Sequence, residues 1–154
     1  MMEVRIVIAA SALLFSSCAA NSGPIEDATI LPVENAALSY RQSPRALTAE
    51  TGWQPSWGEI RSLEARLPEA LSSRPEAVEM TFGDPPQGWY RQYSGSVRDG
   101  RRYIYGSYFP KIHDFGDEWR TRRIIVDDGG PDVFFVIYDV EKALIVHIVF
   151  NGHS

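Results

Sequence analysis

Two apolar runs near the carboxyl end constrain the fold more than any other part of the sequence. They cover residues 133–138 and 143–150 and are joined by a polar link, 139–142. Both runs are rich in β-branched and aromatic residues and are too short for typical helices, so they predict neighbouring antiparallel strands. The second run is apolar on both faces apart from His147. This composition predicts a strand inside a sheet that is covered on each side.

The length and composition are those of one globular domain. The chain has 154 residues, of which 44% are hydrophobic and 12% aromatic, enough to form a genuine core. Fifteen basic residues against 20 acidic ones give a net charge of −5. A nucleic-acid partner is therefore not expected, because binding phosphates needs a basic footprint.

The amino-terminal end has the pattern of an export signal. Arg5 precedes an unbroken run of apolar and small residues from Ile6 to Phe15. This run is too short for a membrane-spanning helix, which needs about 20 residues, and so predicts a signal peptide. Cys18 is the only cysteine of the chain, so it forms no internal disulfide, and it follows the run at the spacing of a cleavage site.

Residues 14–18, Leu-Phe-Ser-Ser-Cys, resemble the lipobox of bacterial lipoproteins. In that family the cysteine is lipidated and becomes the first residue of the mature chain. Phe15 departs from the usual leucine, and Ala19 resembles the pattern of lipoproteins passed on to the outer membrane. The resemblance implies a palmitate-type acyl anchor on Cys18 and a location in the bacterial cell envelope, on the periplasmic face of the outer membrane. Cleavage near residues 19–20 as an ordinary secretory signal is the alternative.

The domain organisation follows from where regular patterns begin. After a lipoprotein signal peptide at 1–17, residues 18–54 show no lasting period and are punctuated by proline and glycine. They predict a flexible tether, which would span roughly 30 Å if it behaves as a coil. An alternative is that residues 30–33 dock on the domain as an extended segment. The domain itself is predicted over 55–154.

A helix is predicted to begin after Ser56. Ser56 and Glu59 have the spacing of a capping box, which satisfies free backbone donors at a helix start. Four apolar residues follow at helical spacing on one face: Trp57, Ile60, Leu63 and Leu67. Pro68 disfavours a helical residue before it, so the helix should end or kink there, with 69–73 adding one more turn.

Asp99 and Gly100 predict a tight hairpin between two strand-like runs, 88–97 and 101–109. Both residues of such a loop must tolerate positive φ, which makes Asp-Gly a strong signal. With these two residues as the loop, Ser94 should lie opposite Tyr105 and Tyr93 opposite Gly106. A glycine facing a tyrosine leaves room for its ring.

Two weaker strand signals complete the predicted fold. Val78, Met80 and Phe82 alternate like a short strand, and 122–126 is a further candidate before the turn at 127–132. Because the connections are short, the sequence predicts an α+β fold. Its sheet would be an antiparallel meander of about four to six strands, with one main amino-terminal helix packed on one face.

Two acidic groups have the composition, but not the spacing, of a cation site. One loop contains His113, Asp114, Asp117 and Glu118, which match neither a helical histidine motif nor a calcium loop. The other group is Asp127, Asp128 and Asp132, whose residue types a turn also needs. A solvated loop and a turn are the preferred interpretations, and we predict no metal and no cofactor.

An enzymatic reading depends on the histidines. A small periplasmic hydrolase would use His113 or His147 with nearby carboxylates. On an apolar strand face, however, His147 is expected to be a hydrogen-bonded structural residue. Ser94 and Ser96 lack a nucleophile-elbow pattern, so no catalytic residue is assigned and an enzyme is not the preferred prediction.

Aromatic residues and arginines interleave along the predicted hairpin. Rings offer flat contact area and arginine a planar donor fork, so such a surface binds sugars, peptide backbones or proteins. The candidate binding residues are Trp89, Arg91, Tyr93, Arg101, Tyr103 and Tyr105. The alternative is that the same side chains stack across the strands and form the core.

A set of short segments resembles small, uncharacterised exported bacterial proteins, which bring no activity with them: 90–93 with Gly95, 103–105, 128–130, 138–139 and 151–152. The predicted function is therefore that of an envelope lipoprotein acting as a small binding module on the periplasmic side. Its partners would be the membrane, through lipidated Cys18, and an envelope protein or glycan, but no nucleic acid. The hydrolase and an inhibitor of an envelope hydrolase are the alternatives.

Overall fold

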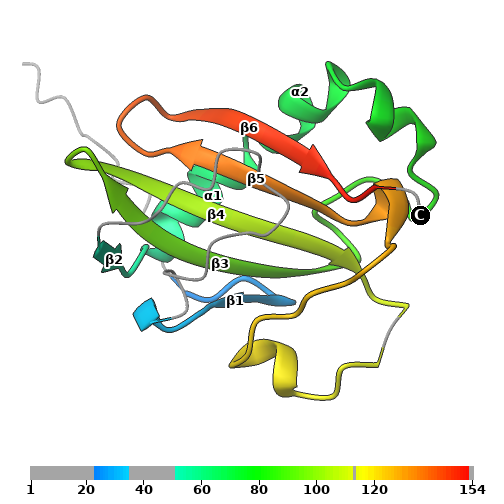
Figure 1. Ribbon diagram of the computed structural model, residues 1–154, viewed down its shortest axis with the longest axis horizontal. Helices are drawn as coiled ribbons and strands as arrows, with labels where there is room; N and C mark the ends of the chain where they lie inside the picture. The colour runs from blue at the N-terminus through cyan, green and yellow to red at the C-terminus, as the bar shows by residue number, and fades with distance from the viewer. Residues whose placement is uncertain (1–22, 35–50, 113, 153–154) are drawn as a thin grey trace, which may run out of the picture.

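The computed structural model describes residues 23–34, 51–112 and 114–152. The signal peptide, Cys18 and His113 lie outside these residues, so the predictions for them stay predictions. The described chain forms a sheet of six strands in the order β1-β3-β4-β5-β6, with β2 also paired to β3, together with short helices (Figure 1). The predicted α+β class is confirmed.

The central hairpin consists of β3 (Trp89–Arg98) and β4 (Arg101–Pro110), which pair antiparallel. Its loop residues Asp99 and Gly100 have φ values of 50° and 70°, as the turn type requires. Tyr93 lies opposite Gly106, so the predicted register is confirmed. A Cβ at position 106 would meet the side chains of Tyr93, Tyr108 and Val136 at 3.0–3.1 Å. The glycine therefore makes room for the neighbouring rings.

The last two strands, β5 (Phe134–Asp139) and β6 (Leu144–Phe150), also pair antiparallel, as predicted. The prediction that the second of them is covered on each side is wrong. β6 is the end strand of the sheet, and Leu144 and Val146 are 53% and 44% exposed. The pairing shifts by one residue after Ile137, which leaves Val146 without an opposite residue on β5. An apolar sequence indicates a strand but does not say whether a neighbour flanks it.

The predicted capping box is present at the start of α1 (Trp57–Glu64). The Ser56 backbone N–H donates to the Glu59 carboxylate at 2.8 Å, and the Glu59 N–H donates to the Ser56 hydroxyl at 3.3 Å. A second helix, α2 (Leu67–Ser72), begins at Leu67 and has Pro68 in its first turn. The helical segment is thus interrupted at residues 65–66, earlier than predicted, and Leu67 is helical although a proline follows it. The main buried cluster contains Ile60, Leu63, Leu67 and Leu71 from these helices and, from the sheet, Tyr93, Ile104, Tyr108, Phe134 and Ile148.

Two short strands lie within the segment for which the sequence predicts a tether. β1 (Ala28–Ile30) pairs parallel with β3, and β2 (Thr51–Trp53) pairs antiparallel with it. The Leu31 N–H donates to the Tyr93 carbonyl at 2.7 Å, and Leu31 is buried. Ile30 and Leu31 therefore dock on the domain as an extended segment, which was the alternative prediction for residues 30–33. The parallel β1 makes the sheet mixed, so the predicted antiparallel meander is not confirmed as a description of the whole sheet.

The two weaker strand predictions are wrong. Residues Pro75–Glu79 form a 3-10 helix, η2, and Val78 is 87% exposed. Residues 122–126 form no strand, and the Gln92 side chain bonds two of their backbone groups. The Gln92 amide donates to the carbonyls of Trp119 and Arg122 at 2.5 and 2.6 Å, and its oxygen accepts from the Ile124 N–H at 2.9 Å.

A second, smaller core holds the long connection between β4 and β5. This connection includes the short 3-10 helices η3 (Glu118–Arg120) and η4 (Gly130–Asp132). Trp119 is buried together with Phe109 and Val133, and Tyr90 packs against them. The connection is therefore part of the folded body and not a free loop.

Candidate binding groove

The structure does not bring the six predicted binding residues together on one surface. Trp89 and Tyr93 are fully buried, and Arg91 and Tyr105 are 5% and 6% exposed. Side chains alternate across a strand, so Trp89, Arg91 and Tyr93 share one face of β3. Tyr105, which is paired with Ser94, belongs to the opposite face. For these four residues the core alternative describes what is observed.

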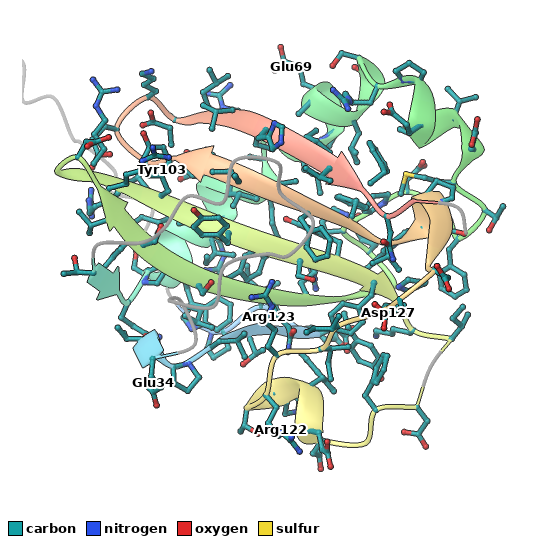
Figure 2. The ribbon with its side chains drawn as sticks, viewed as in Figure 1. Glu34, Glu69, Tyr103, Arg122, Arg123 and Asp127 are labelled. Atoms are coloured by element: carbon teal, nitrogen blue, oxygen red, sulfur yellow. The ribbon has the colours of Figure 1, made fainter. Side chains whose placement is uncertain are left out.

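Two of the six residues remain at the surface near the hairpin loop. Arg101 is exposed and Tyr103 is partly exposed. Figure 2 labels Tyr103 close to the β3–β4 turn, far along the sheet from Glu69 on α2. Of the six predicted binding residues, only these two are accessible to a partner.

Arg91 belongs to a buried polar network. Its guanidinium Nη1 lies 2.9 Å from Glu64 Oε1, and the Tyr93 hydroxyl donates to the same oxygen at 2.6 Å. The hydroxyls of Tyr93 and Tyr108 are 3.2 Å apart. Burial, followed by the neighbouring Tyr108 and Glu64 charges, raises the pKa of Tyr93 well above its ordinary value. The network provides partners for the Glu64 carboxylate, both tyrosine hydroxyls and the Arg91 Nη atoms, whereas Arg91 Nε is buried with no hydrogen-bond partner among the described residues.

The acidic loop between β4 and β5 engages its carboxylates locally. Asp114 accepts from the Gly116 N–H at 2.9 Å, and Asp117 and Glu118 pair with Arg120 and Arg122 at 3.5 and 3.4 Å. Asp132 accepts from the N–H and hydroxyl of Thr81 and from the Phe82 N–H, which ties η4 to the segment after η2. Within residues 23–34, 51–112 and 114–152, no three His, Cys, Asp or Glu side chains gather as a metal site.

His147 is exposed on β6, so the expectation of a buried structural histidine is wrong. Among the described residues, β6 ends the strand order and no strand lies on its outer side. No ion pair joins His147 to a carboxylate in the part of the chain that the structure describes. Its position at the sheet edge places it on the rim of a groove.

A groove of about 620 Å³ lies between α2 and β6. The helix wall comes from one face, with residues at helical spacing: Arg66, Glu69, Ala70, Ser73 and Arg74. The strand wall is residues 143–148. A further hollow of about 410 Å³ shares Arg74 and His147 with the groove and extends to residues 150–152. Together the two hollows follow the whole length of β6. Figure 2 shows Glu69 on α2, pointing away from the sheet.

The strand wall is the edge of the sheet, and among the described residues no strand pairs with its outer side. An end strand leaves a row of backbone N–H and C=O groups without a strand partner, and proteins commonly blunt such edges with charges, proline or a covering segment. β6 contains neither a proline nor, apart from His147, an ionisable side chain. Leu144 and Val146 add exposed apolar surface. Chemically, this arrangement suits the addition of another extended strand, with α2 flanking its side chains.

Sequence reasoning missed this groove, although one signal for it was present. Its strand wall was interpreted as a buried strand, and the helix wall was treated as a short extra turn. That signal was His147, the one ionisable side chain in an otherwise apolar run, which fits an exposed strand better than a covered one.

Comparisons with known proteins add no further constraint. Scans of the chain against protein-family models, curated proteins and solved structures find no match. None of the helices in the described part of the chain has both the length and the apolar composition to cross a membrane.

Proposed function

We propose that this protein is an envelope lipoprotein that acts as a small binding module on the periplasmic side of the membrane, anchored through lipidated Cys18. The lipobox resemblance of residues 14–18 supports the location. The antiparallel run from β3 to β6, with α1 packed on one face, serves as the rigid scaffold. The single observation that supports the binding role is β6, an uncharged edge strand beside a groove.

The proposed mode of binding is β-strand addition by an envelope protein. Free backbone groups of an edge strand recognise the backbone of another extended chain, while the neighbouring groove receives alternate side chains. A glycan is the weaker candidate, because sugars favour aromatic platforms and the aromatic candidates Trp89, Tyr93 and Tyr105 are buried.

The lipid anchor is tested on the native protein. Mass spectrometry of the membrane fraction is expected to find Cys18 as the first residue, carrying an acyl mass. The Cys18→Ala variant should stay as an uncleaved, unacylated precursor, because the thiol that carries the lipid is missing. A mature native protein with a free Cys18 thiol, found in the soluble fraction, would remove the anchor and the proposed location together.

The binding surface is tested by crosslinking in intact cells. A photoreactive residue at Val146 is expected to capture a partner, whereas the same residue at Ile125 should not. Both positions are apolar and exposed, at 44% and 69%, but only Val146 lies on the groove edge. A third probe at Arg101 tests the surface remaining at the hairpin.

A charge substitution provides the matching loss of function. With the photoreactive residue moved to Ser73 on the helix wall of the groove, Leu144→Lys combined with Val146→Lys should reduce capture by at least tenfold, because charged edge residues oppose strand addition. The fold should persist, since both side chains are exposed, and circular dichroism checks this. Capture that is equally strong from Arg101, or unchanged in the double variant, would show that β6 is not the binding edge.

A further inference from the structure

The two arginines on the helix wall of the groove differ in their partners. Arg74 is paired with Glu76 at 3.2 Å and lies over the Phe150 ring at 6.0 Å. Arg66 is exposed and has no ion pair among the residues that the structure describes. It lies beside Ala143, with which it lines both the groove and a smaller adjoining hollow. At one end of the groove Arg74 is thus paired with a carboxylate, whereas Arg66 at the other end has no such partner among the described residues.

The direction of an added strand decides which of its ends meets Arg66. Antiparallel pairing is slightly more stable per residue than parallel pairing, and each consecutive pair from β3 to β6 is antiparallel. A strand added antiparallel to β6 begins near Phe150 and ends near Leu144. Its carboxyl-terminal residues therefore lie at the Arg66 end of the groove.

The middle of the groove has the opposite charge. Glu69 is exposed, lies one helical turn after Arg66 and has no ion pair among the described residues. It disfavours a second acidic residue at the centre of an added strand. Ala70, Ile145 and Ile148 supply the apolar part of the lining, which suits β-branched side chains at alternate positions.

We propose that the occupant of the groove is an extended segment of a partner protein, about seven residues long, that pairs antiparallel with β6 and has a carboxylate near its carboxyl end facing Arg66. This inference rests on the proposed function and adds the chemistry of the partner to it. A second copy of the chain fits less well, because its own β6 contains no acidic residue to meet Arg66.

The test is selection of random seven-residue peptides by display on the purified full mature chain. Enriched peptides are expected to be β-branched at alternate positions, with Asp or Glu at one of the last two. For one such peptide, Arg66→Ala should weaken binding about two- to fivefold, as expected for loss of a solvent-exposed ion pair. Arg66→Glu should shift the selection to Lys or Arg at the same positions. The matched control Glu69→Gln should keep the preference for a terminal acid.

The outcomes separate this inference from the proposed function. Enriched peptides that lose binding in the Leu144→Lys, Val146→Lys variant bind at β6. If such peptides show no preference for a terminal acid, the carboxylate proposal is wrong, while the groove remains the proposed binding site. If the double variant binds the peptides equally well, both proposals fail. If no peptide is enriched and sedimentation shows a dimer that the double variant dissociates, the occupant is a second copy and the carboxylate proposal is overturned.

Discussion

Replacing Arg91 by leucine is expected to lower the free energy of unfolding by about 3–5 kcal/mol, the range for breaking one side of a buried ion pair. The side chains of Arg91 and Glu64 are only 6% and 13% exposed and lie 2.9 Å apart. Removing the guanidinium leaves the Glu64 carboxylate in the core with the Tyr93 hydroxyl as its remaining donor. It also removes the donor to the Glu26 carbonyl, which helps to hold the segment before β1. Denaturant unfolding followed by circular dichroism measures the loss.

Two control variants make the Arg91 prediction specific. Arg98→Leu changes the same residue type on the same strand, but Arg98 is 41% exposed and its contact with Asp99 is 3.6 Å, so its cost should stay below about 1 kcal/mol. In the second control, Glu64→Leu is added to Arg91→Leu and should recover much of the stability, because no unpaired charge is left in the core. Equal costs for Arg91→Leu and Arg98→Leu would contradict a buried network.

The Arg91 result also bears on how binding is studied. The sequence alone indicates Arg91 as a contact residue, but its substitution would reduce partner capture simply by destabilising the domain. Variants at Leu144 and Val146 avoid this problem because their side chains are exposed. A binding assay is therefore informative only with groove-edge variants.

Trp119→Ala is expected to cost about 3–5 kcal/mol, the range for truncating a buried tryptophan. Trp119 is 2% exposed, and its ring centroid lies 4.7 Å from that of Tyr90. Its carbonyl also accepts a hydrogen bond from the buried Gln92 amide. Losing the side chain should therefore release the connection between β4 and β5 from the sheet. Thermal and denaturant unfolding measure the cost, and limited proteolysis within residues 114–126 should become faster.

Ile125→Ala is the matched control in the same connection. Ile125 is 69% exposed, so its truncation should change the free energy of unfolding by less than about 0.5 kcal/mol. If Trp119→Ala were as mild as this control, the connection would be a loop that contributes little to the fold, contrary to its buried position.

Features that depend on interactions between neighbouring residues could be predicted from the amino-acid sequence. The Asp99-Gly100 turn set the hairpin register, because positive φ at two successive positions suits few residue types. Ser56 and Glu59 marked a helix start through two hydrogen bonds made within four residues. The antiparallel pairing of the last two strands likewise followed from local chemistry. These elements were sufficient to predict the α+β class.

Which side chains and strands are buried, in contrast, could be seen only in the tertiary structure. The sequence indicates Arg91 and Tyr93 as contact residues. In the structure both are buried and form hydrogen bonds with Glu64, which lies 27 and 29 residues before them in the chain. β6 looks buried, yet no described strand pairs with its outer side. The groove exists because α2 lies beside a strand some 75 residues later in the chain. Neighbouring residues determine whether a segment forms a helix or a strand. Its solvent exposure depends instead on contacts with residues far away in the sequence, which a local pattern does not show.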